Sequence, residues 1–330
     1  MATTKTQFDI NNLTRTPTQQ KLAITVLSGG PSGEREVSLD SGRAVARALE
    51  SLGHRVYVED ANPQNLTGLA RQVDCVFIAL HGAFGEDGQI QEILERRGLA
   101  YCGSGPDACR LAMDKAAAKL AFIDLGIPTP RFEVADGSTL RQPQAARSVP
   151  VVVKPVAEGS SLNCFIVRDP ACFQAVLEKV VGHYGQALIE QYIPGRELTV
   201  AILGDRALPP IEIRTPREFY DYTAKYADEY TQYDFDISLP EALLRRIMDM
   251  SLAAHHGLGC RDFSRLDWRV DERCNPFLLE VNVIPGLTSH SLLPKAAAKA
   301  GISMPQMCQS IIDSAIKRKF ARAGASPARS

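Results

Sequence analysis

The sequence has no long apolar run, no excess of charge of one sign and no paired cysteine motif. No stretch approaches the roughly 20 apolar residues that cross a bilayer. The 37 Lys and Arg residues against 38 Asp and Glu give a formal net charge of −1. This balanced charge provides no general electrostatic attraction to nucleic acid or to an anionic membrane. The eight cysteines are scattered without a CxxC pair, which argues against a disulfide framework or a zinc site and favours a reducing cytoplasm.

The composition that remains is that of an ordinary globular protein. The 330 residues are 45% hydrophobic and 23% charged. At about 100–200 residues per domain, this length predicts two or three domains. The polar segment 1–20 lacks the apolar core of a signal peptide, so we expect a disordered lead-in there and a frayed tail at 321–330.

Residues 21–105 alternate between strand and helix patterns, with a helix expected at 38–52. Three apolar runs predict strands at 22–27, 55–58 and 75–80. Such alternation is typical of a parallel sheet that binds ligands at the carboxyl ends of its strands. The glycines of 29–33 resemble half of a dinucleotide fingerprint, with Asp60 as its acid, but their spacing is GGxxG rather than GxGxxG.

From residue 106 onward the pattern changes. An Ala- and Lys-rich helix is expected at 107–125. Further strands are expected at 151–153, 187–190 and 198–203, and further helices at 171–181, 241–256 and 304–322. The segment 216–239 is rich in Tyr and Asp with little periodicity, and a loop of that length is usually functional, often a lid.

The strongest chemical signal lies in two segments that alternate polar and apolar residues, 264–269 and 277–283. Alternation predicts two half-buried strands, and the turn-forming residues 271–276 predict an antiparallel hairpin. With Val270 opposite Phe277, one face of the hairpin carries two cross-strand pairs. These pairs are Asp267 with Glu280 and Arg265 with Asn282.

The side chains of this face suit a hard cation. Two carboxylates and an amide oxygen are donors that Mg²⁺ prefers, with water or substrate phosphates in the remaining positions. Arg265 beside them can hold a carboxylate or a developing negative charge. The alternative is an amphipathic hairpin that exposes a charged face to solvent. The attached loop 284–292, which contains Gly, Ser and His, favours the site.

A second candidate site begins at Lys154, which ends a Val-rich strand and precedes the small residues of 155–161. An ammonium group and several backbone N–H groups in such a loop can surround phosphates, although no Walker motif GxxxxGK[ST] occurs. A solvated lysine on a surface turn is the alternative. Weaker candidates, each with an ordinary structural role available to it, are Lys115, Glu190, Glu34 and His81.

In their order along the chain, these segments resemble the D-alanine–D-alanine ligase family of the ATP-grasp superfamily, from about residue 21 to residue 316. One such string arises easily by chance, but not ten in the family's order. The strings are SGEREVS (32–38), HGAFGEDG (81–88), MDK (113–115), VKP (153–155), EGSS (158–161), FYDY (219–222), AKY (224–226), TQY (231–233), PG (285–286) and SHSL (289–292), together with Arg265, Asp267, Glu280 and Asn282.

The resemblance implies a mixed α/β and α+β fold, a three-domain ATP-grasp ligase with an N-terminal Rossmann-like parallel-sheet domain. The expected boundaries are 21–105, 106–193 and 194–320, with the nucleotide between the last two domains. The implied reaction ligates two D-alanines with ATP through an acylphosphate, for peptidoglycan precursor synthesis. The implied partners are small molecules, with no nucleic acid or membrane, and family members are commonly homodimers.

The resemblance also implies roles for individual residues. The ligands of two Mg²⁺ or Mn²⁺ ions would be Asp267, Glu280 and Asn282. The ATP-binding residues would be Lys115, Lys154, Glu190, Gln191, Ile193, Glu197, Phe219, Lys225 and Leu279. The catalytic set would be Glu34, Ser160, Tyr226, Arg265 and Gly286, and the substrate residues would be His81, Ser291 and Leu292. Relatives that make D-alanyl-D-lactate differ at Tyr226, so an amine nucleophile is expected.

Three segments depart from the family pattern. The phosphate loop continues Leu162-Asn163 where the family usually has Val-Gly, 164–166 is more apolar, and 234–238 replaces Cys-Pro-Ala. Asparagine tolerates left-handed backbone but adds bulk, so we expect an active ligase with an altered nucleotide KM or rate. The alternatives are a ligase for another amino acid, a paralogue that only binds nucleotide, and an NAD-dependent dehydrogenase built on the 29–33 turn.

Overall fold

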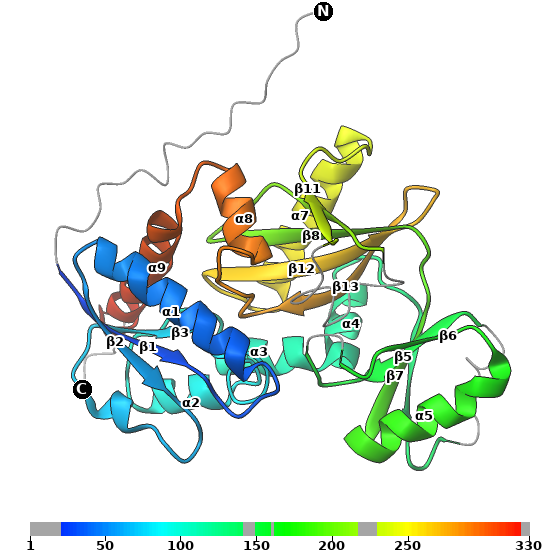
Figure 1. Ribbon diagram of the computed structural model, residues 1–330, viewed down its shortest axis with the longest axis horizontal. Coiled ribbons are helices and arrows are strands. Elements are labelled where there is room, and N and C mark those ends of the chain that lie inside the picture. The colour runs from blue at the N-terminus through cyan, green and yellow to red at the C-terminus, as the bar shows by residue number, and fades with distance from the viewer. Residues whose placement is uncertain (1–20, 141–148, 160–161, 217–229, 325–330) are drawn as a thin grey trace, which may run out of the picture.

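The computed structural model describes residues 21–140, 149–159, 162–216 and 230–324, which form three sheets with helices around them (Figure 1). The N-terminal sheet is three-stranded and parallel, in the order β2-β1-β3. Its strands are β1 (Ala23–Ser28), β2 (Arg55–Asp60) and β3 (Cys75–Ile78), and helix α1 (Arg35–Ser51) joins the first two. The predicted parallel sheet is therefore confirmed.

The central sheet is four-stranded and antiparallel, in the order β4-β7-β5-β6. Its strands are β4 (Phe132–Asp136), β5 (Val151–Pro155), β6 (Phe165–Val167) and β7 (Gln186–Gln191). Helix α5 (Pro170–Tyr184) packs against β5 and β7 through Phe173 and Leu177, which are fully buried. In Figure 1 this sheet and α5 form the green lobe at the right.

The C-terminal sheet is six-stranded, in the order β11-β10-β8-β12-β13 with β9 beside β8. All of its pairings are antiparallel. The strands are β8 (Arg196–Leu203), β9 (Arg206–Ala207), β10 (Ile211–Arg214), β11 (Gln232–Asp234), β12 (Phe263–Val270) and β13 (Pro276–Asn282). The predicted metal-binding side chains lie on two neighbouring strands of this sheet, Asp267 on β12 and Glu280 and Asn282 on β13.

The single helix predicted at 107–125 is wrong: the segment forms two helices, α3 (Pro106–Met113) and α4 (Lys115–Asp124). Asp114 leaves the helical conformation between them, and its carboxylate accepts hydrogen bonds from the backbone N–H groups of Ala116 and Ala117, as an N-cap does. The remaining helices are the short 3₁₀ turn η2 (Thr67–Ala70), α2 (Gln89–Arg96), α7 (Glu241–Gly257), α8 (Leu292–Lys299) and α9 (Met304–Gly324).

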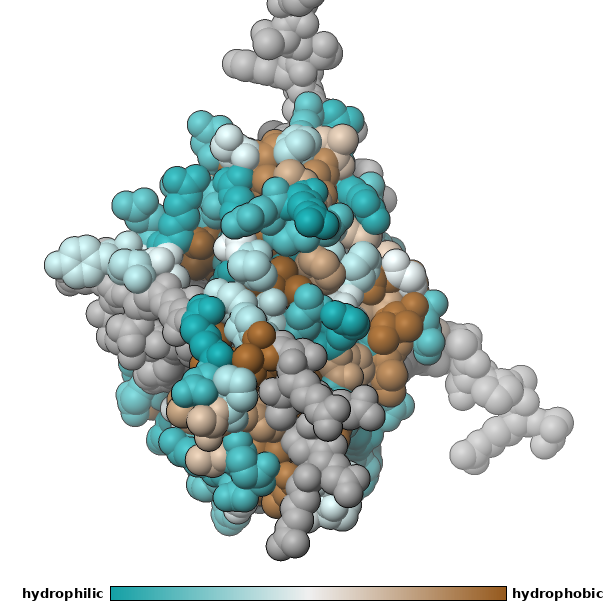
Figure 2. Space-filling model, turned by 90° about the vertical axis from the view of Figure 1, so that its right-hand side faces the viewer, coloured by the Kyte–Doolittle hydropathy of each residue, from teal (hydrophilic) through white to brown (hydrophobic). Residues whose placement is uncertain are grey.

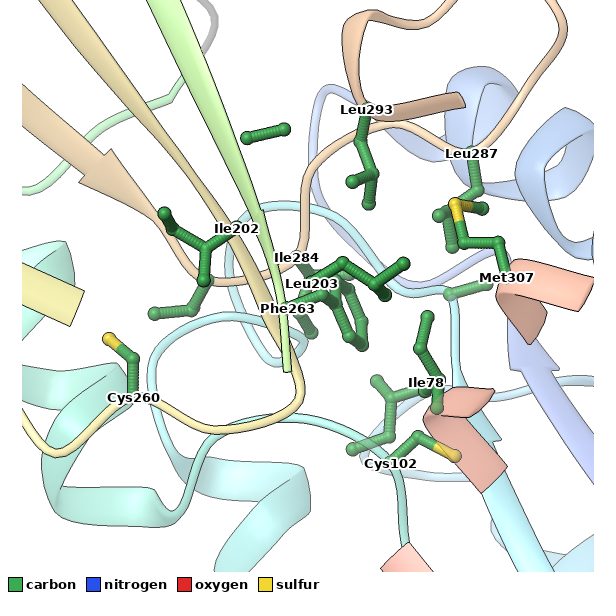
Figure 3. Packing of buried hydrophobic residues seen from close by; sticks show 14 of the residues in the cluster. Ile78, Cys102, Ile202, Leu203, Cys260, Phe263, Ile284, Leu287, Leu293 and Met307 are labelled. Atoms are coloured by element: carbon green, nitrogen blue, oxygen red, sulfur yellow. The ribbon is translucent and has the colours of Figure 1, made fainter. Parts of the chain in front are cut away.

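The buried apolar side chains fall into two clusters. The larger one joins the N-terminal and C-terminal sheets, and Figure 3 shows Ile78 and Cys102 packed near Leu203, Phe263 and Met307. Helices α3 and α4 also contribute to it. The smaller cluster lies between the central sheet and α5. The N- and C-terminal sheets therefore share one core, whereas the central sheet has its own.

On the surface, apolar and polar side chains are interspersed on the face shown in Figure 2. Within the described part of the chain, no helix is long and apolar enough to cross a membrane. All eight cysteines are free thiols, five of them buried.

Candidate active site

Strands β12 and β13 form the predicted hairpin, with Arg265 opposite Asn282 and Asp267 opposite Glu280, so both predicted pairs are confirmed. The predicted pairing of Val270 with Phe277 is wrong, because Val270 lies opposite Pro276. A register shift after Asp267 accounts for the difference: it accommodates one extra residue on β13, and the ladder moves by one position beyond it.

Asp267 is the most heavily hydrogen-bonded side chain of this face. Arg265 donates to it with both arms of its guanidinium group, Nε to Oδ1 at 2.9 Å and Nη2 to Oδ2 at 2.7 Å. Thr199 on the neighbouring β8 donates its hydroxyl to Oδ1 at 2.7 Å, and Asn282 Nδ2 donates to Oδ2 at 3.1 Å. These four donors fix the position of a carboxylate that is only 9% exposed.

The chemistry of the donors fits a divalent metal. Asp267 and Glu280 offer carboxylate oxygens from facing positions, and Asn282 turns its amide nitrogen to Asp267, which directs its oxygen elsewhere. These are hard oxygen donors of the kind Mg²⁺ prefers, and too few for a cage of protein ligands alone. Consistent with this, no group of three His, Cys, Asp or Glu side chains suited to a metal occurs in the described ranges. Such a site takes its remaining ligands from water or substrate.

A cavity opens beside this face, between the central sheet and the C-terminal sheet. Its apolar walls come from Val152, Ile166 and Leu162 of the central region, and its polar walls include Glu280 and Asp267. The predicted ATP-binding residues that the structure describes all line this one cavity: Lys115, Lys154, Glu190, Gln191, Ile193, Glu197 and Leu279. Apolar walls with a few charged groups are typical of a small-molecule pocket.

Two lysines enter the cavity from different elements. Lys154, near the end of β5, donates to Glu190 Oε1 at 2.6 Å, and the negative charges of Glu190 and Glu280 raise the pKa of Lys154 although its burial acts to lower it. Lys115, the first residue of α4, donates to the Glu158 carbonyl and lies 3.8 Å from Glu280 Oε2. Both ammonium groups thus lie in the same cavity, and the pKa of Lys154 favours its charged form.

Arg269 is a residue of this cavity that the sequence did not single out. It donates to the carbonyl groups of Ile193 and Gly195 at 3.1 and 2.9 Å, and to the Glu197 carboxylate at 3.2 Å. It thereby holds the segment that joins β7 to β8, which contains the predicted ATP-binding residue Ile193, and the predicted ATP-binding residue Glu197 on β8. Its place in the alternating pattern of β12, two residues after Asp267, is the signal that could have identified it.

Glu34, at the start of α1, is the point where the N-terminal region meets the phosphate loop. Its side chain is 9% exposed, and a Cβ atom at Gly159 or Gly82 would lie only 2.7 or 3.0 Å from Glu34 Oε2. With a Cβ at Gly159, the Glu34 carboxylate would have to shift, because real Cβ atoms essentially never come closer than 3.0 Å to another heavy atom. Glu34, whose ordinary role at the start of a helix is to offset the helix dipole, therefore also lies against the central region.

A second, smaller cavity adjoins the first. It shares Lys115, Glu158 and Glu280 with the larger cavity and is closed by Gly159, Asn282 and the N-terminal Glu86. Glu86 belongs to the HGAFGEDG string, but the sequence did not single it out as a site residue. Its carboxylate accepts from the backbone N–H groups of Gly82 and Ile284 at 2.7 and 3.2 Å. Burial and the nearby Glu34 raise the pKa of Glu86 to about 8.

His81 supports the loop that follows β13. Its Nδ1 lies 2.9 Å from the Ile284 carbonyl and its Nε2 lies 2.9 Å from the Ser41 hydroxyl. Since a carbonyl only accepts, Nδ1 carries the proton and Nε2 accepts from Ser41. Burial lowers the pKa of His81, which favours this neutral form. Ser41 Oγ in turn accepts from the backbone N–H of Leu287, so the predicted substrate residue is also a structural one.

The predicted substrate loop ends at α8, a helix that the sequence pattern did not predict. Ser291 occupies its N-cap position and Leu292 its first turn. The Ser291 Oγ accepts from the backbone N–H of Thr288 at 3.1 Å, and a Cβ at Gly286 would lie 2.6 Å from it. Gly286, Ser291 and Leu292 therefore lie together at the start of a helix, which is a favourable place for an anionic group.

Four predicted site residues lie outside the described residues: Ser160, Phe219, Lys225 and Tyr226. The predicted lid at 216–239 is described only at its ends, where β11 pairs with β10. The predicted disordered segment 1–20 lies outside as well. The frayed tail predicted at 321–330 is wrong for 321–324, which belong to α9, and its remainder lies outside the described residues.

Asp60, the acid that follows the glycine-rich turn at 29–33, has a structural partner and does not require a nucleotide to explain its presence. Arg35 donates to both carboxylate oxygens of Asp60, at 2.8 and 2.5 Å. This ion pair lowers the pKa of Asp60 and occupies the acid that the dehydrogenase alternative requires.

Asn163 adopts the left-handed conformation, with φ of 52°, and its Nδ2 donates to the Tyr184 hydroxyl at 2.7 Å. This bond attaches the phosphate loop to the end of α5. We expect Asn163→Gly to remove it and raise the ATP KM about threefold to fivefold, since one hydrogen bond contributes about 1 kcal/mol. Tyr184→Phe removes the same bond without altering the loop backbone, so steady-state kinetics should give the same change. Unequal effects of the two variants would contradict this account.

The comparisons with known proteins agree with this geometry. Residues 122–313 match the family model "D-ala D-ala ligase C-terminus" and residues 52–104 match "D-ala D-ala ligase N-terminus". The chain is 45% identical over 300 residues to the D-alanine–D-alanine ligase of Citrifermentans bemidjiense, covering 90% of this chain and 97% of the relative.

Solved structures are similar in the same way. The D-alanine–D-alanine ligase of Bacillus anthracis complexed with ATP has a TM-score of 0.80 at 31% identity, covering 91% of this chain and 99% of the other. The VanG D-Ala:D-Ser ligase of Enterococcus faecalis has a TM-score of 0.79 at 27% identity, covering 90% and 100%. The fold is that of the ATP-grasp enzymes. The chain belongs to the D-alanine–D-alanine ligase family.

Proposed function

We propose that this enzyme uses ATP to join two D-alanine molecules into D-alanyl-D-alanine, for peptidoglycan precursor synthesis. The observation that carries the proposal is the pair of adjoining cavities that share Lys115, Glu158 and Glu280. The larger suits a nucleotide. The smaller cavity lies where the phosphates of that nucleotide would meet groups from the N-terminal region. A ligase that phosphorylates a small carboxylate requires such an arrangement.

In the first step, a carboxylate oxygen of one D-alanine attacks the γ-phosphorus of ATP, so that the bond from γ-phosphorus to the bridging oxygen breaks and ADP leaves. Lys115 and Lys154 would neutralise the phosphate charge in this step. Glu34, which lies against Gly159, would bind the ammonium group of the same D-alanine. Asp267, Glu280 and Asn282 would hold two Mg²⁺ or Mn²⁺ ions, which when bound offset charge on the phosphates.

In the second step, the amine of another D-alanine, having lost a proton, attacks the acylphosphate carbonyl. Arg265 and the backbone N–H of Gly286 would stabilise the oxyanion, and phosphate leaves when the carbonyl re-forms. Ser291 and Leu292 at the start of α8 would hold the carboxylate of this second molecule. Ser160 and Tyr226 would join Glu34 in closing the site, which must exclude water from the acylphosphate.

Three further points belong to this proposal. Gln191, Ile193, Glu197 and Leu279 would line the adenine and ribose, with Phe219 and Lys225 contributing from the lid. The enzyme would work in the cytoplasm as a homodimer. Its domain boundaries would be 21–105, 106–193 and 194–320, with ATP between the last two.

Phosphate release from Mg²⁺–ATP by the purified protein tests the function. We expect turnover with D-alanine alone and D-alanyl-D-alanine as the product by mass spectrometry, with no turnover without an amino acid or with L-alanine. Arms with D-alanine plus D-serine or D-lactate measure the preference at the second site. Nucleotide binding without D-alanine-dependent turnover would mean a different substrate or an inactive paralogue.

A further inference from the structure

A buried lysine lies directly behind the nucleotide cavity. Lys119 is on α4, one turn after Lys115, and its side chain is completely buried. Its Nζ lies 2.9 Å from Glu190 Oε2 and donates to the Thr129 hydroxyl at 2.7 Å. Thr129 donates in turn to the carbonyl of Leu278 on β13. Unlike Lys115, Lys119 does not line the cavity in the part of the chain that the structure describes.

Glu190 lies between two cations. Its Oε1 accepts from Lys154 at 2.6 Å on the cavity side, and its Oε2 faces Lys119 on the buried side. Burial acts to raise the pKa of Glu190, but Lys119 and Lys154 together lower it. Taking a second ammonium group out of water is costly, so its presence needs a reason beyond the neutralisation of one carboxylate.

The charges of the cavity supply that reason. Among the described side chains that line it, carboxylates outnumber cations. If Lys119 were absent, Lys154 and Glu190 would form a neutral ion pair. Such a pair would attract a phosphate only weakly. Burial lowers the pKa of Lys119, and the negative charge of Glu190 opposes that shift. Counted with both ammonium groups protonated, the group of Lys119, Glu190 and Lys154 has a positive formal charge, and its cavity-facing member is Lys154.

We propose that Lys119 is the permanent counter-ion of Glu190 and is therefore a positioning residue that leaves the Lys154 ammonium available to the phosphates of the nucleotide. The inference rests on the proposed use of ATP. Lys119 acts through Glu190 and Lys154 and does not touch the nucleotide itself.

The test is calorimetric binding of the Mg²⁺ complex of a non-hydrolysable ATP analogue, without amino acids. Lys119→Met is expected to weaken binding about tenfold to 100-fold, the size expected for interactions of charged groups. In steady-state assays, Lys119→Met should change kcat much less than it changes the KM for ATP. Lys317→Met, at an exposed lysine of α9, is the matched control and should bind as the unaltered enzyme does.

A double-mutant comparison separates this role from a merely structural one. In a Glu190→Gln background the carboxylate to which Lys154 donates is gone, although the charge of Glu280 remains. Adding Lys119→Met should then change binding by no more than about twofold. Lys119→Met alone leaves the buried Glu190 carboxylate without Lys119, whereas the double variant has no carboxylate at this position. The double variant can therefore still be measured if the single variant fails to fold. An equal loss in both backgrounds, or no loss in either, would overturn the proposal.

These outcomes distinguish the inference from the proposed function. Failure of the unaltered enzyme to bind the analogue would overturn both. Binding that is unaffected by Lys119→Met overturns the inference alone. The binding experiment contains no amino acid, so an unexpected amino-acid substrate would leave its result unchanged.

Discussion

Replacing Gly159 by alanine is expected to lower kcat/KM for D-alanine about 100-fold, because displacement of a positioning group by about 1 Å has an effect of this size. The new Cβ would lie 2.7 Å from Glu34 Oε2, and its three nearest atoms would all belong to Glu34. Glu34 must therefore move, and with it the predicted binding point of the substrate ammonium group. Amino-acid-dependent phosphate release measures the effect.

The same substitution at Gly137 is the matched control. A Cβ there meets nothing within 4 Å, so Gly137→Ala should leave activity unchanged. Thermal unfolding should show that Gly159→Ala is folded, since the side chain displaced is the flexible end of a glutamate. Activity of Gly159→Ala within twofold of the unaltered enzyme would mean that the Glu34 position does not matter to the reaction.

The second large effect is expected for Asp267→Asn, which should reduce D-alanine-dependent phosphate release about 1,000-fold, the upper end for loss of one electrostatic group in an active site. The amide has nearly the same shape as the carboxylate. It removes the negative charge that holds the Arg265 guanidinium through two hydrogen bonds and that belongs to the predicted metal ligands. Stopped-time assays over a range of Mg²⁺ concentrations measure the loss.

A graded control comes from the neighbouring strand. Thr199→Val removes one hydroxyl donor to Asp267 but keeps the carboxylate, so we expect a loss of about tenfold, the lower end for the partner of a metal ligand. Additional Mg²⁺ should recover part of the Thr199→Val loss and none of the Asp267→Asn loss. Full recovery of Asp267→Asn by Mg²⁺ would show that its charge is dispensable.

The sequence predicted the face of the hairpin better than its full register. Alternation places these polar side chains on one face, because side chains in strands have a period of two, and the pairing of Asp267 with Glu280 followed from an assumed pairing of Val270 with Phe277 that is itself wrong. The register shift beyond Asp267 could not be predicted, since no Gly or Pro marks it and Leu279 fits either register. The two predicted pairs nevertheless held, because the shift lies between Asp267 and the turn of the hairpin and leaves the register from Asp267 to Arg265 unchanged.

Lys119 shows where sequence reasoning had no access to the answer. In an Ala- and Lys-rich helix a lysine usually lies on the solvated surface, and periodicity alone gives no sign of the carboxylate that approaches from β7.

The break between α3 and α4 at Asp114, in contrast, could have been predicted from the sequence. An aspartate before Lys-Ala-Ala is a recognisable N-cap, so α4 could have been separated from α3.

The division of the buried side chains into two clusters has a consequence for how the enzyme opens. A sheet with its own small core is a cooperative unit that can unfold or exchange its amide protons with less free energy than the whole molecule. A ligand that contacts both the central and the C-terminal sheets raises the free energy needed to unfold the central sheet by its own binding free energy. Substrate occupancy would thus set the local stability of the central lobe, and amide exchange there would report nucleotide binding without any chemical turnover.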